Sequence, residues 1–209
     1  MQKKKVRTAV IGAGKMGAIH AKVYDQLEQS DFIAVVDIDA DKARPLAEQY
    51  NCSAFSDYTD IIGKVDAVTI ATPTVTHLNL AKKFIKNNIA VLIEKPLAVN
   101  VTEGRKIAAM GEVHYQELAL HYTGSPVSTA AMLHLNLSVP NCAVQEHAPF
   151  ASWMNEVVPN SLTTEDGYLL RPDGPGLGID LNEDRIPAHP YSPSEPPHWR
   201  REDGSIQDW

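Results

Sequence analysis

Three glycines near the start of the chain have the spacing that lets a backbone bind phosphate. Gly12-Ala13-Gly14-Lys15-Met16-Gly17 matches G-x-G-x-x-G. In this pattern the first glycine permits a tight turn, the second lets the backbone approach a pyrophosphate, and the third lets a helix pack against a strand. The N–H groups at the start of that helix, at its positive dipole end, can hold the phosphates. Asp37 lies twenty residues after Gly17, where an acid can bind a ribose 2′-hydroxyl. The spacing predicts a dinucleotide site.

Such a site needs a strand before the glycines and a helix and a second strand after them. Residues 6–11 form a β-branched apolar run, typical of a strand buried on both faces. A helical pattern of apolar residues follows from Ile19 to Leu27, and residues 32–36 form a second apolar run that ends at Asp37. A bare G-x-G-x-x-G arises by chance, and a merely structural turn is the alternative. Here the strand, helix, second strand and acid all stand in order.

The pattern of alternating strands and helices continues to residue 93. Asp39 is a plausible N-cap for a helix over 40–50, and His77 opens a further helix. A short helix is expected over 58–62, and strands over 52–55, 66–71 and 89–93. This rhythm predicts an α/β fold with a doubly wound parallel Rossmann sheet, whose strand ends lie along one edge beside the glycine turn. We expect strand order 3-2-1-4-5-6, with residues 116–120 as the sixth strand and residues 143–146 as a candidate addition at the edge.

Composition narrows the class of protein. The net charge of −7 argues against nucleic-acid and membrane-surface partners, and no apolar run is long enough to span a membrane. Cys52 and Cys142 have no paired spacing, so neither a disulfide framework nor a zinc site is indicated. Buried, inert thiols in a cytoplasmic protein are the expected interpretation.

Several spaced motifs in the first half carry a family resemblance. Val10 to Gly17, Val36-Asp37, Ala71-Thr72-Pro73 with His77, and Glu94-Lys95-Pro96 resemble the cofactor domain of the glucose–fructose oxidoreductase / inositol dehydrogenase family (Gfo/Idh/MocA), over about residues 4–104. The resemblance implies hydride transfer between NAD(P) and a hydroxyl carbon of a sugar or cyclitol, and so a small sugar-like substrate. NAD is expected, and NADP less so, because Asp37 should repel a 2′-phosphate and no Arg or Lys follows until Lys42.

The same resemblance assigns roles to single residues. Lys95 matches the family's active-site lysine, and an ammonium at a strand end can polarise or help deprotonate an alcohol. Its alternative is an ordinary surface lysine before a proline turn. The role of His77 is left open: it either contacts the cofactor, or it caps a helix or packs at a solvated position. The expected cofactor-binding residues are Gly12, Gly14, Lys15, Met16, Gly17, Asp37, Thr72, Pro73, His77, Glu94 and Lys95.

The second half of the chain differs from the first in its charge balance and its content of Pro and Gly. Residues 1–104 hold 13 Lys and Arg against 12 Asp and Glu, whereas residues 105–209 hold 6 against 14. Helices are expected over 102–113 and 127–137, and strands over 116–120 and 142–146. From Pro149 on the chain is irregular and rich in Pro and Gly, and we expect it to be loosely packed.

Several segments of this half resemble the end of an enolase-superfamily mannonate or galactonate dehydratase. They are Leu120-His121, Gly124 to Val127, Ala130 to His134, Val139 to Asn141, Gln145-Glu146 and Gly174 to Asp180. The resemblance implies the last two strand–helix units of a (β/α)₈ barrel, with His121 as a catalytic general base and Glu146 as an acid at the next strand end. Without the resemblance, a His and a Glu at two successive strand ends are equally consistent with residues at the rim of the sheet that have no catalytic role. The three carboxylates that would hold Mg²⁺ are absent, so no metal site and no tight Mg²⁺ binding are expected.

The chain therefore resembles a fusion. The expected domains are a dinucleotide-binding domain over 1–104, barrel-derived βα units over 105–148 and an irregular tail over 149–209, with the join between Val99 and Glu112. Three functions compete: an NAD(P)-dependent oxidoreductase without its substrate domain, a fragment of a Mg²⁺-dependent dehydratase, and a nucleotide-binding module without turnover. The sequence leaves the oligomeric state open.

Overall fold

The computed structural model describes residues 4–122, 124–159, 162–192, 199–200 and 206–207. The chain divides into two compact units, one of Met1–Ala119 with Val139–Val144 and the other of Leu120–Ser138 with Gln145–Trp209. The whole five-stranded sheet belongs to the first unit.

The first unit alternates strands with helices. In chain order these are β1 (Val6–Ile11), α1 (Lys15–Gln26), β2 (Ser30–Val36), α2 (Ala40–Gln49), β3 (Ser53–Phe55), the 3₁₀ helix η1 (Tyr58–Ile61), β4 (Ala67–Ile70), the 3₁₀ helix η2 (Thr74–Thr76), α3 (His77–Lys86), β5 (Ala90–Ile93) and α4 (Val101–Val113). The strands pair in parallel in the order β3-β2-β1-β4-β5. The chain reverses direction across the sheet beside β1, which confirms the predicted doubly wound α/β fold.

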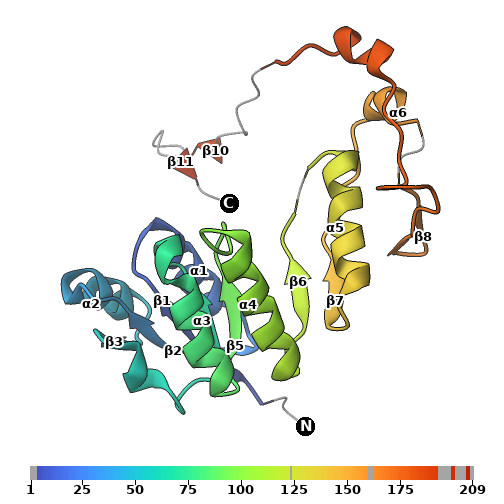
Figure 1. The fold of residues 1–209 in the computed structure, drawn as a ribbon. Helices are drawn as coiled ribbons and strands as arrows, with labels where there is room; N and C mark the ends of the chain where they lie inside the picture. The colour runs from blue at the N-terminus through green and yellow to red at the C-terminus, as the bar shows by residue number, and fades with distance from the viewer. Residues whose placement is uncertain (1–3, 123, 160–161, 193–198, 201–205, 208–209) are drawn as a thin grey trace. The chain divides into compact units, whose positions relative to one another are not determined.

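The central strands are buried on both faces because alternate residues enter different clusters. Ala34 and Val36 of β2 join a cluster that includes Phe84 of α3. Val35, between them, packs with Ala43 of α2. Helices α3 and α4 lie side by side over one face of this sheet (Figure 1). A continuous β-branched run, rather than an alternating one, is what two covered faces require.

Side chains cap the N-termini of helices α2 and α4. Asp39 Oδ1 accepts a hydrogen bond from Asp41 N at 3.1 Å, which confirms the predicted N-cap of α2. Asn100 Oδ1 accepts from Glu103 N at 2.9 Å at the start of α4. Helix α4 then runs unbroken to Val113, through the interval in which the two resemblances meet.

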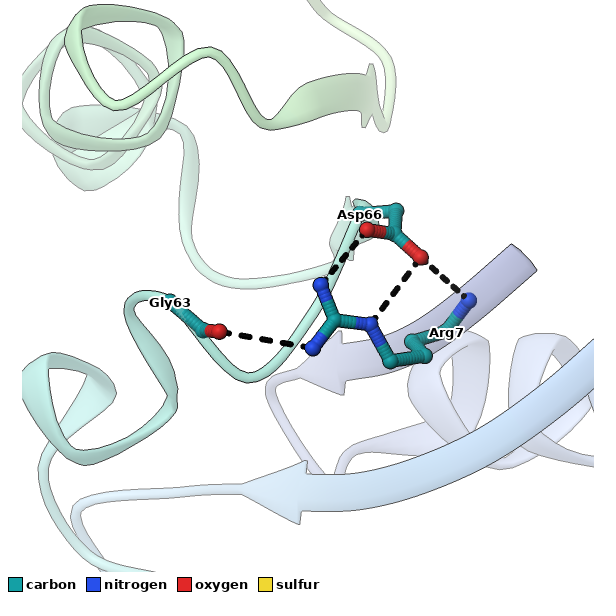
Figure 2. Close-up of polar contacts among 3 residues, drawn as sticks. All are labelled: Arg7, Gly63 and Asp66. Carbon is teal, nitrogen blue, oxygen red and sulfur yellow. Dashed lines mark hydrogen bonds and ion pairs between the residues drawn. The ribbon is translucent and has the colours of Figure 1, made fainter.

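An ion pair joins β1 to the loop before β4, at the sheet edge opposite the glycine turn. Figure 2 shows the Arg7 guanidinium donating to both Asp66 oxygens, with Nη2–Oδ1 2.7 Å and Nε–Oδ2 3.1 Å. Arg7 also donates its backbone N–H to Asp66 Oδ2 at 2.9 Å and its Nη1 to Gly63 O at 3.4 Å. The hydrogen bonds from Arg7 lower the pKa of Asp66 to about 2.

We expect Asp66→Asn to weaken the fold at neutral pH but not in strong acid. The folded pKa of about 2 lies below the unfolded value of about 3.9. The stabilisation is therefore present above about pH 4 and is lost as pH falls through the folded pKa. Both side chains are more than a third exposed, at 38% and 39%, so solvent screening limits the loss to about 1 kcal/mol.

Thermal melts from pH 2.5 to 7 test this, with Asp173→Asn, which breaks the more exposed Arg171 pair, as control. A constant difference between Asp66→Asn and wild type at every pH would contradict it.

The predicted sixth strand does not join the sheet. Strand β6 (Leu118–Leu120) pairs with β7 (Cys142–Gln145) in a separate two-stranded sheet. Leu118 N donates to Asn141 O at 2.6 Å, so the hydrogen bonds of β6 go to the strand that follows the next helix. The expected order 3-2-1-4-5-6 is wrong at its last strand, and residues 143–146 do not extend the sheet edge. The described sheet ends at β5.

Helix α5 (Pro126–Ser138) connects β6 to β7, and the described residues after β7 form short elements only. These are α6 (Met154–Val157), β8 (Thr164–Glu165), β9 (Tyr168–Leu169), the 3₁₀ helix η3 (Glu183–Ala188), β10 (Trp199–Arg200) and β11 (Ile206–Gln207). The tail is not wholly irregular, because Asp166 and Gly167, at φ 49° and 83°, form a tight turn between β8 and β9. Within the described residues, no helix is long and apolar enough to cross a membrane.

Candidate dinucleotide-binding site

The glycine turn connects β1 to α1, and its three glycines have different surroundings. Gly12 has φ +101° and donates its N–H to Val36 O at 2.7 Å. A Cβ at Gly17 would lie 1.8 Å from Gly12 O, so the helix can sit this close to the turn only without a side chain. A Cβ at Gly14 would meet no atom within 4 Å outside its immediate chain neighbours. Gly12 and Gly17 are thus required by the fold, whereas Gly14 leaves open space at the start of α1.

A cavity of about 1040 Å³ opens beside this turn, between the ends of β1, β2 and β4 and the first turns of α3. Of the predicted cofactor residues, five line it: Gly12, Gly14, Asp37, Thr72 and Pro73. Lys15 and Met16 lie in the first turn of α1 and Gly17 packs beneath it. Glu94, Lys95 and His77 are not among the lining residues.

Asp37 is fixed at the end of β2 by backbone groups on both sides. Its Oδ2 accepts from Ala13 N at 2.7 Å and its Oδ1 from Asp39 N at 2.9 Å. Each carboxylate oxygen can accept a further bond, so the anchored side chain can still receive hydroxyl donors from a ribose. The same contacts hold the glycine turn against β2.

The remaining cavity wall combines apolar and charged side chains that sequence reasoning missed. Ile38 and Val75, which are 95% and 69% exposed, add apolar surface from the loop after β2 and from η2. Lys42 Nζ lies 3.3 Å from Asp39 Oδ2, so one lysine of the wall is offset by an acid. Lys83 comes from α3, four residues after Asn79 and therefore on the same helix face. An apolar wall beside an open phosphate turn fits the purine and pyrophosphate of a nicotinamide dinucleotide.

His77 is buried, with an exposed fraction of 1%. Its Nε2 lies 2.8 Å from Thr72 O and its Nδ1 lies 3.2 Å from Leu97 O. The imidazole thus connects the loop after β4 to the loop after β5. It is not a solvated side chain, and the structure places it behind the cavity wall rather than in it.

Glu94 and Lys95 stand at the end of β5, on the same sheet edge as the glycine turn. Glu94 Oε2 accepts from Lys95 N at 3.1 Å, and its Oε1 lies 2.7 Å from His20 Nε2 on α1. The Lys95 side chain is exposed, and the Lys95–Pro96 peptide bond is cis. Sequence reasoning missed His20, although its place one helical turn after Gly17 puts it on the same face of α1.

In the second unit His121 and Glu146 are brought together at the ends of β6 and β7. His121 Nδ1 lies 2.6 Å from Glu146 Oε2, which also accepts from Tyr122 N at 2.7 Å. Both side chains are well exposed, at 59% and 41%. Among the residues that the structure describes, no group of three or more His, Cys, Asp or Glu is arranged to hold a metal ion.

The two cysteines are unpaired and partly buried. Cys52 packs with the α2 cluster, and burial raises the pKa of its thiol to about 11. A thiol so far from ionisation at neutral pH is a poor nucleophile.

A doubly wound parallel sheet, a glycine turn that opens into a large cavity and an anchored acid at the end of β2 define a dinucleotide-binding Rossmann domain. The profile of the GFO_IDH_MocA oxidoreductase family, with an NAD-binding Rossmann fold, matches residues 6–121. The chain belongs to this family.

Solved structures agree with this assignment. UDP-N-acetylglucosamine 3-dehydrogenase GnnA from Acidithiobacillus ferrooxidans is 30% identical with a TM-score of 0.53, over 65% of this chain and 44% of that one. GenD2 from gentamicin A biosynthesis, in complex with NAD, is 26% identical with a TM-score of 0.55, over 67% of this chain and 42% of that one.

Other relatives carry a different name. A D-galactonate dehydratase family member of Streptomyces bingchenggensis is 39% identical over 114 residues, which is 54% of this chain and 28% of that protein. The chain spans between 21% and 36% of the length of the curated relatives it matches.

Proposed function

We propose that this chain binds NAD and carries the cofactor half of an oxidoreductase that acts on a hydroxyl carbon of a sugar-like molecule. One observation carries the proposal: the cavity at the glycine turn and Lys95 at the end of β5 lie on the same edge of one sheet. A relative named UDP-N-acetylglucosamine 3-dehydrogenase supports a sugar or sugar nucleotide as the substrate class. A titration with NADH, followed by fluorescence, tests the first half of the proposal.

Different residues of the first unit would bind the cofactor and act on the substrate. The open space at Gly14 and the N–H groups of α1 receive the pyrophosphate, while Asp37 accepts from the adenosine ribose. When bound, the nicotinamide ring supplies the hydride acceptor or donor. Lys95, exposed at the strand end, would take the proton of the reacting hydroxyl as the neutral amine during oxidation, and would give a proton to the carbonyl oxygen as the ammonium during reduction.

We also propose that the chain is incomplete as an oxidoreductase. The family match ends at residue 121, and this chain covers 44% of GnnA. A substrate-binding sheet would occupy the remainder of such a protein. NADH binding is therefore expected to be strong and turnover weak. The proposed limits of the dinucleotide-binding domain are residues 1–104, followed by βα units over 105–148 and a tail over 149–209.

We expect NAD to be preferred over NADP by at least about tenfold, or about 1.4 kcal/mol. The Asp37 carboxylate would meet a 2′-phosphate directly, and the next lysine in the sequence, Lys42, is already paired with Asp39. Parallel titrations with NADH and NADPH measure the ratio. Asp37→Ala should reduce it, with Asp41→Ala on the exposed first turn of α2 as control. Equal affinities in the wild-type protein would rule this out.

A second proposal concerns the His121–Glu146 pair at the ends of β6 and β7. We propose that residues 105–148 derive from a dehydratase barrel and that they no longer catalyse. Removing the α-proton of a sugar acid requires a metal to take up the developing charge, and Mg²⁺ needs more ligands than a single exposed carboxylate.

We therefore expect no Mg²⁺-dependent dehydration of mannonate or galactonate by this chain. An assay for 2-keto-3-deoxy acids with Mg²⁺ in excess over the protein tests this. His121→Ala is the matched variant. Product that forms with the wild type and disappears with His121→Ala would overturn the view of this region as inert.

A further inference from the structure

The carboxylate of Glu94 is held between two elements of the first unit. His20 Nε2, from α1, lies 2.7 Å from Glu94 Oε1, and the Lys95 N–H donates to Oε2 at 3.1 Å. The side chains of His20 and Glu94 are largely buried, at 21% and 16% exposed. Both oxygens of the carboxylate are thus engaged, one by a helix and one by the strand end that carries Lys95.

The charge on Glu94 decides the direction of these bonds. Burial, the largest single influence, raises the pKa of Glu94, but the hydrogen bonds from His20 and from the Lys95 N–H, with the nearby positive charges, together lower it. An ionised carboxylate only accepts, so Nε2 of His20 carries the hydrogen. Such a charge-assisted bond is stronger and more strictly oriented than one between neutral groups.

His20 also connects two parts of the cofactor site. It lies one helical turn after Gly17, which packs against Gly12 O at the glycine turn. Through Glu94 it reaches the backbone of Lys95. The pair therefore joins the helix that faces the phosphates to the strand end that faces the reacting hydroxyl.

We infer that His20 is a positioning residue for Lys95, acting through Glu94. His20 holds the Glu94 carboxylate in place, and this carboxylate holds the Lys95 backbone N–H. The position from which the Lys95 side chain extends is thereby fixed relative to α1. This inference rests on the role proposed for Lys95. Placement errors of about 1 Å at a reacting group can cost about 100-fold in rate, so an anchor of this kind matters for chemistry more than for binding.

Two variants of His20 distinguish the effect of its hydrogen bond to Glu94 from the effect of its imidazole ring. His20→Leu removes the donor, while His20→Gln keeps an amide N–H that can reach the same oxygen. Glu94→Gln replaces one acceptor oxygen by an amide nitrogen and should resemble His20→Leu. His114→Leu is the control, since this ring makes only a 3.4 Å contact with Asn88 Oδ1 near the opposite end of β5.

The first readout is the acylation of Lys95 by acetic anhydride relative to Lys86, measured by mass spectrometry without any cofactor. We expect the Lys95-to-Lys86 ratio to rise in His20→Leu and Glu94→Gln, because the Lys95 backbone is released, and to return toward the wild-type value in His20→Gln. The second readout is turnover, with kcat expected to fall about tenfold in His20→Leu while the Kd for NADH stays within about twofold.

The outcomes are distinct from those that test the proposed function. A wild-type ratio in His20→Leu and Glu94→Gln overturns the positioning role, even if NADH binds and Lys95 is catalytic. If the wild type binds no NADH, the proposed function fails, and the acylation ratio still decides whether His20 holds Lys95. If His20→Leu does not fold, Glu94→Gln and His20→Gln decide, because both retain a polar side chain at the buried site.

Discussion

Gly17→Ala is expected to lower the affinity for NADH by at least about 100-fold, or about 2.8 kcal/mol. The added Cβ would lie 1.8 Å from Gly12 O, a backbone atom that cannot rotate away. Helix α1 must then move off the turn, and its N–H groups move away from the phosphates. The same displacement should reduce the free energy of unfolding by about 1–3 kcal/mol.

The neighbouring Gly14→Ala separates binding from folding. Outside the immediate chain neighbours, no atom lies within 4 Å of a Cβ at Gly14, so the melting temperature of this variant should match that of the wild type. Its NADH affinity should still fall by about tenfold, because the methyl group occupies the approach of the pyrophosphate. Gly104→Ala in α4 is the control: its Cβ meets only Leu97 Cδ2 at 3.9 Å, and stability should rise without a change in binding. If Gly17→Ala binds NADH as the wild type does, the cavity is not the dinucleotide site.

The first half of the fold was predictable because its signals are local. A two-face-buried strand such as β1 needs a continuous apolar run, and a helix packed on a turn needs a glycine at Gly17. Asp37 could be placed by counting residues, since strand length fixes where an acid reaches the sheet edge. Thr72 and Pro73 follow for the same reason, as the residues directly after a parallel strand.

The features that sequence reasoning missed depend on contacts between distant segments. Strand β6 has only three residues, and whether it pairs with β5 or β7 depends on where the chain after Asn141 returns. Buried His77 meets the backbone carbonyl of Leu97, which lies twenty residues away in the sequence. His20 has no pattern of its own, and its partner Glu94 is 74 residues further along the chain. Periodicity assigns a face to such residues but not the atom that they meet.

Lys95→Ala is expected to lower kcat by at least about 100-fold in any alcohol oxidation that the protein catalyses. The Lys95 amine follows the end of β5 on an exposed side chain, and the Lys95 backbone N–H is bound to the Glu94 carboxylate. Removing it leaves the hydroxyl proton without an acceptor while the hydride is transferred. Lys95 is not among the residues that line the cavity at the glycine turn, so the Kd for NADH should stay within about twofold. A loss confined to kcat marks a group that acts in the transition state.

Lys95→Arg sharpens this test, because it keeps the charge and removes the ability to release a proton. If Lys95 only attracts or polarises the substrate, the arginine should restore much of the rate; if it transfers the proton, Lys95→Arg should be as slow as Lys95→Ala. Lys86→Ala, at the end of α3, controls for the loss of a lysine from the first unit. Stopped-flow measurement of NADH formation with UDP-sugars and inositols compares the four proteins. A Lys95→Ala protein with wild-type kcat would make Lys95 an ordinary surface lysine and would leave the domain with nucleotide binding as its function.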